Sequence, residues 1–234
     1  QPWLSRVSRN VSHFGIHVIG LNFRFPVIAR CYDMNREVNY LDVGCGIHSP
    51  TATKYEFPLV RYYGIDWDIG YNNTQEDIDN IDKFFEMDLS KLEFDDVPNN
   101  FFDVINMSHI IEHLHNGEEV IRGLIPKLKD GGIIYIEFPN MHSTNLPSKD
   151  STLNFFDDPS HVRIYSLREL YNILLSENMA FVEGGRRKNR MRNLLVPLEA
   201  LKHLYLYGHI KGGMLWDIMG FADYCVFRKK VIET

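Results

Sequence analysis

The stretch of the chain best suited to chemistry is YLDVGCGIHSPT, residues 40–51, where an apolar run meets an aspartate and two glycines spaced one residue apart. Gly44 and Gly46 let the backbone turn tightly and bring its N–H groups against a ligand without an intervening Cβ. Asp66 closes the next apolar run, twenty residues after Gly46. A carboxylate there can accept both hydroxyls of an adenosine ribose. This spacing predicts a ligand that contains adenosine.

Asp42 separates the two common ligands of such a turn, NAD and S-adenosylmethionine. It lies two residues before Gly44, at the end of the first apolar run. A carboxylate there would repel a pyrophosphate and attract the positive sulfonium and amine of S-adenosylmethionine. A dinucleotide turn also needs a third glycine, and the chain has none near Ser49. Both features favour S-adenosylmethionine.

At this point the chain resembles the class I S-adenosylmethionine-dependent methyltransferases, in particular the small-molecule subgroup. DVGCG matches their first motif, Asp66 matches their ribose-binding acidic residue, and the aspartate of MDL, Asp88, matches the residue that commonly holds the adenine amino group. The resemblance spans roughly residues 38–180 and includes FDVINMSHIIEHL (102–114), LKDGGIIYIEFPN (128–140) and HVRIYSLREL (161–170). His48 departs from the family, which usually has glycine or a small residue there.

The resemblance implies a cofactor site whose members lie at the ends of the first four strands. They are Asp42, Gly44, Cys45, Gly46, Asp66, Trp67, Asp88, Leu89, Met107, Ser108 and His109.

His161 is the candidate catalytic residue. It follows Asp157 and Asp158 in FFDDPSHVR, on a loop that faces the methyl donor in this family. A histidine can take a proton from a hydroxyl as that hydroxyl attacks the methyl group, and a carboxylate can hold its tautomer. The alternative is a histidine that bonds to the loop backbone and only fixes the loop.

A second group of histidines lies in HIIEHLH, residues 109–115. His109 and His113 would share one helical face, but the order differs from HExxH and no second cluster supplies further ligands. The sequence therefore predicts no metal site, and His109 is instead expected at the edge of the cofactor pocket.

The elements that must position these residues alternate between strands and helices. Apolar runs predict strands at 39–43, 60–66, 84–88, 101–106, 132–138, 179–185 and 222–228. A helix at 120–128 should end at the Gly131–Gly132 pair, with a kink or an early last turn at Pro126. Ser166 and Glu169 predict a capping box before another amphipathic helix.

This alternation predicts an α/β fold: a Rossmann-like, doubly wound, mostly parallel seven-stranded sheet with helices on both faces. One domain should cover residues 1–234. Within it we expect an N-terminal cap segment (1–37), which includes Trp3, Phe14, Phe23 and Phe25, a cofactor-binding core (38–185), a cap or insertion (186–221), and a last strand with its tail (222–234).

Composition narrows the functional classes. The 234 residues are 44% hydrophobic and 24% charged, with a formal net charge of −6, so bulk charge does not attract nucleic acid or an anionic membrane. Three widely spaced cysteines indicate reduced thiols, the first residues lack the pattern of a signal peptide, so none is expected, and no apolar run is long enough to span a bilayer. These features predict a cytoplasmic protein.

Two segments have more than one interpretation. RRKNRMR (186–192) has five basic residues in seven, which suits either a solvated turn or a clamp for a phosphate, a carboxylate or a nucleotide-linked sugar. Residues 194–221 are apolar and aromatic, which indicates core packing or contact in a homodimer. They could instead cover an apolar acceptor or rest on a membrane surface.

The predicted activity is methyl transfer from S-adenosylmethionine to a hydroxyl of a small molecule or glycan. A nucleic-acid methyltransferase is the alternative enzyme, although Asn106-Met107-Ser108-His109 lacks the signature of base-amine methylation. A non-enzymatic alternative is a partner subunit that binds the cofactor without activity. An NAD oxidoreductase is the interpretation that the sequence favours least.

Overall fold

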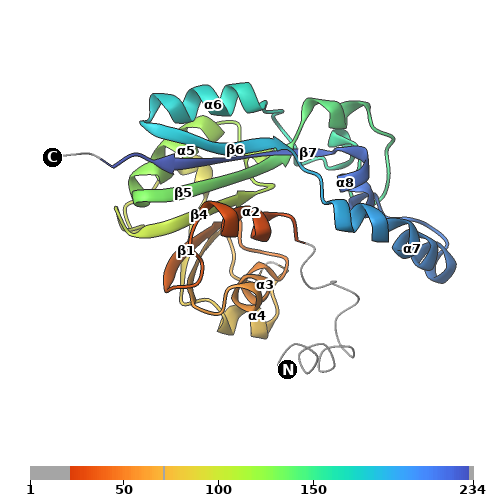
Figure 1. Cartoon of the computed structure of the whole chain (residues 1–234), viewed down its shortest axis with the longest axis horizontal. Coiled ribbons are helices and arrows are strands. Elements are labelled where there is room, and N and C mark those ends of the chain that lie inside the picture. Colours follow the sequence, from red (N-terminus) through yellow and green to blue (C-terminus); the bar gives the residue numbers. More distant parts are fainter. Residues whose placement is uncertain (1–21, 71, 232–234) are drawn as a thin grey trace.

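The computed structural model describes residues 22–70 and 72–231, without the side chains of residues 190–192. A seven-stranded sheet in the order β3-β2-β1-β4-β5-β7-β6 runs through it (Figure 1). Strands β1 to β5 are parallel, whereas β7 pairs antiparallel with β5 and with β6. The strands are β1 (Val38–Val43), β2 (Val60–Asp66), β3 (Lys83–Glu86), β4 (Phe102–Ser108), β5 (Leu128–Pro139), β6 (Met179–Arg186) and β7 (Ala222–Lys229). The predicted mostly parallel, seven-stranded fold is confirmed.

Helices cover both faces of this sheet. They are α2 (Arg24–Cys31), α3 (Ser49–Glu56), α4 (Gln75–Asp79), α5 (Gly117–Leu124), α6 (Leu167–Ser176), α7 (Arg190–Tyr207) and α8 (Trp216–Met219). One buried cluster joins α5 and α6 to one face, and a second joins α2 to the other. Of the N-terminal cap segment, Phe23 and Phe25 belong to the second cluster, while Trp3 and Phe14 lie outside the described residues.

The alternation of side chains along β1 explains how one strand serves both layers. Leu41 and Val43 belong to the cluster under α5 and α6, whereas Tyr40 belongs to the cluster under α2. Asp42 points to the same face as Tyr40, because successive side chains of a strand alternate. A carboxylate is thereby placed in the interior, and the surrounding structure must satisfy it.

The end of α5 differs from the prediction. The helix ends at Leu124, and a 3₁₀ turn that contains Pro126 follows. Proline lacks a backbone N–H and clashes with the preceding helical turn, so the early last turn is confirmed. The glycine cap is wrong, because Gly131 and Gly132 lie inside β5, where Leu128 already pairs with Phe102.

The start of α6 forms half of the predicted capping box. The Ser166 hydroxyl accepts the N–H of Glu169 at 3.2 Å. The Glu169 carboxylate pairs with Arg163 rather than returning to the N-cap backbone. The helix therefore begins where the sequence indicates, and its first carboxylate fixes the loop that precedes it.

Core packing, one of the interpretations of residues 194–221, holds for only part of this range. Phe221 lies in a buried cluster against which Leu215, Trp216 and Met219 pack. Helix α7 buries Val196 and Ala200, but these large apolar side chains of the helix are exposed: Leu194, Leu198, Leu201, Leu204, Tyr205, Leu206 and Tyr207. The helix extends away from the end of the sheet (Figure 1). None of the helices in residues 22–70 and 72–231 has the length and apolar character needed to cross a membrane.

Lys127 provides a test of the packing between α5 and β5. Its buried ammonium donates to the carbonyls of Phe94 and Val97 at 2.9 and 2.7 Å. Lys127→Met would leave both buried carbonyls without their donor, so we expect a loss of about 2–4 kcal/mol in the free energy of unfolding. Urea unfolding measures this loss, with the exposed Lys91→Met as the control. An unchanged midpoint would contradict the assignment.

Candidate active site at the carboxyl ends of the strands

Four of the predicted site residues end neighbouring strands on the same edge of the sheet. Asp42 lies one residue before the end of β1, Asp66 ends β2, Asp88 follows β3 and Ser108 ends β4. The strand order places β1 between β2 and β4, so the winding direction reverses between β1 and β4. Ligands of open α/β sheets bind at this kind of position, which makes this edge the candidate active site.

Asp42 is buried, with 1% of its surface exposed. It accepts hydrogen bonds from the Tyr62 hydroxyl and the Asn106 amide, both at 2.6 Å, and from the Ser49 hydroxyl. Asn106 sits directly opposite Asp42 in the register between β1 and β4. Internal donors thus contact both carboxylate oxygens, so Asp42 links β1 to β2, β4 and the start of α3.

Arg24 is a member of this network that the sequence reasoning missed. Its guanidinium donates to the Ser49 hydroxyl at 2.7 Å, next to Asp42. Burial would lower the pKa of Arg24, but Asp42 and the neighbouring tyrosines Tyr40, Tyr62 and Tyr135 together outweigh burial and raise that pKa. The sequence offered one signal, a single arginine between Phe23 and Phe25 in an otherwise apolar segment.

The glycine turn that follows β1 is strained in two places. Gly44 has φ +76°, and its N–H donates to the Ile65 carbonyl at 2.8 Å. Ile47 and His48 both adopt the left-handed region, which is uncommon for residues other than glycine. The His48 ring is held by the Asp77 carboxylate at 2.6 Å. The positive φ at His48 is one that glycine adopts without strain, which fits the glycine that the resemblance implies for this position.

Three predicted cofactor residues have side chains that pack in the interior. The thiol of Cys45 lies in the cluster under α2, and burial raises its pKa. Met107 is fully buried in the opposite cluster, and Leu89 packs against that cluster. The backbone of Cys45 belongs to the turn itself, and its carbonyl accepts from Asn73 at 3.4 Å. These residues therefore shape the site through their backbone.

Asp66 and Asp88 have environments suited to hydroxyl and amine donors. Asp66 is half-buried, and its Oδ1 accepts the Trp67 N–H at 2.8 Å. Burial raises the pKa of Asp66, and two backbone N–H groups oppose that shift. Asp88 is exposed, and hydrogen bonds from the hydroxyl and N–H of Ser90 lower its pKa. The Trp67 residue between these carboxylates is 65% exposed.

These observations fit the adenosine part of S-adenosylmethionine. Asp66 is a partly buried carboxylate whose recorded hydrogen bonds come from backbone N–H groups, so its remaining lone pairs suit two ribose hydroxyls. Gly46 contributes one of those N–H groups, which ties Asp66 to the glycine turn. Asp88 lies one strand further along, where an adenine amine would follow the ribose.

A chain of buried charges closes the other side of the site. His109 approaches Glu112 at 3.1 Å with Nδ1 and Glu137 at 2.9 Å with Nε2. Glu137 also accepts from Arg187 at 2.6 Å, and Arg187 donates to Asp217 at 3.0 Å. These ion pairs connect the turn after β4 to β5, to Arg187 just after β6 and to α8, so they fix α8 and the residues after β6 to the sheet.

The charges in this row shift the pKa values of His109 and Glu137. Burial would lower the pKa of His109, but the hydrogen bonds that its ring donates to Glu112 and Glu137 overcome the effect of burial and raise the pKa to about 9. Burial likewise opposes ionisation of Glu137, yet Arg187 and His109 hold its pKa far below the usual range. The His109 ring also lies 4.7 Å from Trp216, whose ring stacks on Phe221 at 4.6 Å.

Part of the basic run 186–192 forms ion pairs within the protein. Arg187 is buried between Glu137 and Asp217. Arg186 approaches Asp223 at 3.8 Å. Two of its five basic side chains therefore have structural partners, which reduces the case for an anion clamp.

His161 lies near the end of the loop between β5 and α6, and its side chain is 5% exposed. Its Nδ1 donates to the Phe155 carbonyl at 2.7 Å, so a neutral ring carries its lone pair on Nε2. That nitrogen lies 3.9 Å from the Asp158 carboxylate. The ring centroid is 4.9 Å from that of His113, on the turn after β4. The predicted loop contact is present, and a basic nitrogen remains.

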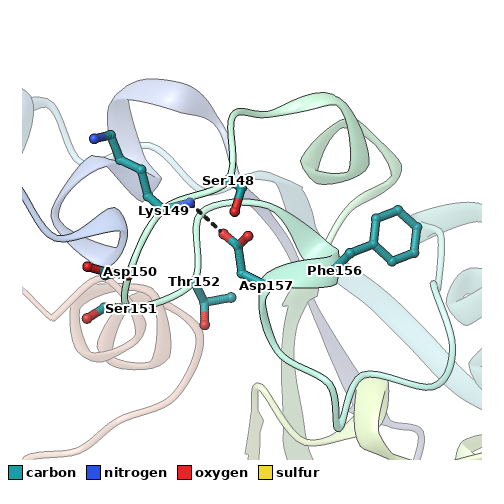
Figure 2. Close-up of a pocket in the computed structure, with 7 residues that line it drawn as sticks. All are labelled: Ser148, Lys149, Asp150, Ser151, Thr152, Phe156 and Asp157. Carbon is teal, nitrogen blue, oxygen red and sulfur yellow. Dashed lines mark hydrogen bonds between the residues drawn. The ribbon is translucent and has the colours of Figure 1, made fainter.

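An open, polar hollow lies on the same loop (Figure 2), lined by Ser148, Lys149, Asp150, Ser151, Thr152, Phe156 and Asp157. The Asp157 carboxylate points toward the loop backbone and accepts the N–H groups of Lys149, Leu153 and Asn154. Burial would raise the pKa of Asp157, but these bonds and one from Ser148 lower it to about 2. Asp157 therefore stabilises the conformation of this loop. The candidate site remains the one at the strand ends.

Comparison with known proteins agrees with this arrangement. A family of methyltransferase domains matches residues 22–183. No curated protein has a sequence that matches this chain. Among solved structures, the fold resembles a phosphoethanolamine N-methyltransferase from Haemonchus contortus, with 16% identity and a TM-score of 0.64 over 91% of this chain and 53% of that one. The chain thus spans about half of that protein.

Two further structures match over most of both chains. One is an S-adenosylmethionine-dependent methyltransferase from Mesorhizobium loti, with 12% identity and a TM-score of 0.61 over 88% of this chain and 98% of that one. The other, from Archaeoglobus fulgidus, has 18% identity and a TM-score of 0.52 over 88% and 93%.

The fold and the acidic strand ends define a nucleotide-binding α/β enzyme of the class I type. The chain belongs to the methyltransferase-domain family, which covers more than half of its length. It is an S-adenosylmethionine-dependent methyltransferase, as the sequence predicted.

Gly44→Ala tests the geometry of the turn. An added Cβ would lie 1.9 Å from Cδ1 of Ile110, at a φ that side chains rarely adopt. We expect at least about a tenfold loss of S-adenosylhomocysteine affinity, because the Ile110 side chain or the turn must shift to relieve the clash and the reactive geometry of the site depends on both. Calorimetry measures this. Gly131→Ala is the matched control, since its φ is +77° and nothing lies within 4 Å of its Cβ. Equal affinities in both variants would contradict the assignment.

Proposed function

We propose that this enzyme transfers the methyl group of S-adenosylmethionine to a hydroxyl of a small molecule or sugar. The observation that carries this proposal is the placement of His161 Nε2, a basic nitrogen close to the turn after β4. The sulfonium is already activated, so the protein mainly has to position the reactants. Orientation of this kind can contribute about 7–11 kcal/mol to lowering the barrier.

The hydrogen bonds of His161 suit it to act on an acceptor hydroxyl. The Phe155 carbonyl holds the proton on Nδ1, and Asp158 would stabilise the ring as it gains a second proton. When the hydroxyl oxygen attacks the methyl carbon, its proton passes to Nε2 and the C–S electron pair stays on sulfur. His161 thus acts as the general base of the reaction.

The structure around the site supports a small acceptor. The loop 140–165 and helices α7 and α8 gather beyond the strand ends (Figure 1). Trp216 and Phe221 stack beside His109, which gives this side an aromatic wall. Arg186 and Arg187 have acidic partners, so the basic run offers less charge to a nucleic-acid backbone. The phosphoethanolamine enzyme from Haemonchus contortus also takes, by its name, a small acceptor.

Asp66→Ala tests the cofactor contacts. Loss of a charged acceptor of two hydroxyl hydrogen bonds should weaken S-adenosylhomocysteine binding by about 10- to 150-fold. Calorimetric titration with S-adenosylhomocysteine and with NAD measures this, and Asp68→Ala, an exposed carboxylate two residues away, is the control. Binding of NAD in place of S-adenosylhomocysteine would overturn the role of Asp66 and of Asp42.

His161→Ala tests the acceptor step. We expect turnover to fall by about 10²- to 10⁴-fold, as for loss of a general base, with S-adenosylhomocysteine affinity unchanged. The measurement is release of S-adenosylhomocysteine across a panel of hydroxyl acceptors, with the exposed His115→Ala as control. If the wild type binds the cofactor tightly but no acceptor raises turnover above the blank, the chain is a cofactor-binding partner subunit.

A further inference from the structure

We propose that Glu112, His113 and His161 form a binding site for a divalent transition-metal cation. The three residues each offer one ligand atom, and these atoms all lie within 4.8 Å of one another. Two ligands of one zinc ion lie no more than about 4 Å apart, because its bonds to nitrogen and oxygen are about 2.0–2.2 Å long. Small side-chain rotations would bring the three atoms around one ion.

Glu112 carries the strongest sign that a ligand is missing. Its side chain is buried, with 1% of the residue exposed, and its Oε1 faces His109 Nδ1 at 3.1 Å. Its Oε2 is buried and has no hydrogen-bond partner among the described residues. A buried carboxylate oxygen without a partner is expensive, and a cation satisfies it directly.

Both histidines are oriented as metal ligands are. His161 Nδ1 donates to the Phe155 carbonyl at 2.7 Å, and His113 Nδ1 lies 3.2 Å from the Ser160 carbonyl. The Ser160 hydroxyl also lies 3.0 Å from His113 Nδ1, but it donates its own proton to Asp158. Since a carbonyl only accepts, each ring keeps its proton on Nδ1 and presents the Nε2 lone pair. Histidines that bind metals usually donate their other N–H to such an acceptor. All three ligands therefore have an outer partner.

The backbone holds the two ligand-bearing segments together. The N–H groups of Val162 and Arg163 donate to the Glu112 carbonyl at 2.9 and 3.2 Å. This contact fixes the residues next to His161 against the turn that carries Glu112 and His113. The site joins segments about fifty residues apart without relying on the ion to assemble them.

The ligand set selects the class of cation. Two imidazoles and one carboxylate suit zinc, cobalt, nickel or ferrous iron better than magnesium or calcium, which prefer oxygen. Asp158 adds a negative charge beside the cluster, because its Oδ2 lies 3.9 Å from His161 Nε2. Three protein ligands leave at least one position of a tetrahedral ion open.

The open position gives the cation a role in methyl transfer, a step that rests on the proposed function. An acceptor hydroxyl bound there would lose its proton to solvent at neutral pH, since such ions lower the pKa of a bound hydroxyl. The oxygen would then attack the methyl carbon while the C–S electron pair stays on sulfur. With the ion bound, His161 would hold the ion and the proton would go to solvent, because one lone pair cannot both bind a metal and accept a proton. In the metal-free protein, His161 keeps the role of direct base given above.

Cobalt provides a spectroscopic test that needs no acceptor. The full chain, freed of metal with a chelator that is then removed, is titrated with Co²⁺ while its visible ligand-field absorption is recorded. We expect saturation at one ion per chain and displacement by Zn²⁺. Absence of a visible band in the wild type would overturn the proposal.

Variants then locate the ion. His113→Ala and His161→Ala should each weaken Co²⁺ binding by at least about tenfold, whereas His115→Ala, an exposed histidine on the same segment, should bind as the wild type does. Glu112→Gln should also weaken Co²⁺ binding. Glutamine is chosen because it keeps the shape of the glutamate side chain, which also contacts His109. S-adenosylhomocysteine titration of each variant verifies that it is folded. Equal Co²⁺ affinity in all variants would overturn the site.

Failure of this proposal can be told apart from failure of the proposed function. S-adenosylhomocysteine binding and turnover test methyl transfer, while the cobalt band tests the site itself. Turnover that disappears with chelator and returns with Zn²⁺ or Co²⁺ supports the role of the ion. Turnover that persists in metal-free protein but falls in His161→Ala would overturn that role and leave His161 as a direct base.

Discussion

The carboxylate of Glu137 holds the two halves of this molecule together. It lies on a central strand, buried from water, and receives His109 from one side and Arg187 from the other, with Tyr135 on its second oxygen. Each of these charges would be costly to bury alone, and removing one partner of a buried pair typically costs about 3–5 kcal/mol. This row of buried charges is stable because negative and positive side chains alternate along it from Glu112 to Asp217. The position of the C-terminal cap over the strand ends follows from this alternation.

A second buried carboxylate, Asp42, organises the cofactor side in the same way. Its donors come from β2, β4 and the start of α3. The Ser108 hydroxyl donates to the Asn106 side chain at 2.9 Å, and Asn106 donates to Asp42, so the end of β4 is tied to this network. His109, the next residue, belongs to the Glu137 chain. The site therefore lies between two internal carboxylates that the ligand need not touch, and these carboxylates fix the residues that do face it.

Most of the fold could be predicted because strands are local features of the sequence. Runs such as GIIYIEF are apolar, β-branched and bounded by turns, and all seven predicted strands are present within a few residues. The Gly131–Gly132 pair is compatible both with the end of a helix and with the interior of a strand. Only the pairing of β5 with β4 shows that the two glycines lie within a strand. Asp42 and Asp66 followed from spacing along the chain, and Asp88 from the family resemblance. Arg24, Arg187 and the contact between His161 and the turn after β4 did not, because their partners lie some 25 to 50 residues away and no local pattern encodes such pairs.

The exposed face of α7 has a consequence for how such an enzyme changes over evolutionary time. Few of its side chains are buried, so most substitutions along it leave the sheet undisturbed. The cap remains attached as long as Arg187 and Asp217 at its two ends are kept. Substitutions along α7 can therefore change this surface while the packing of the sheet stays the same.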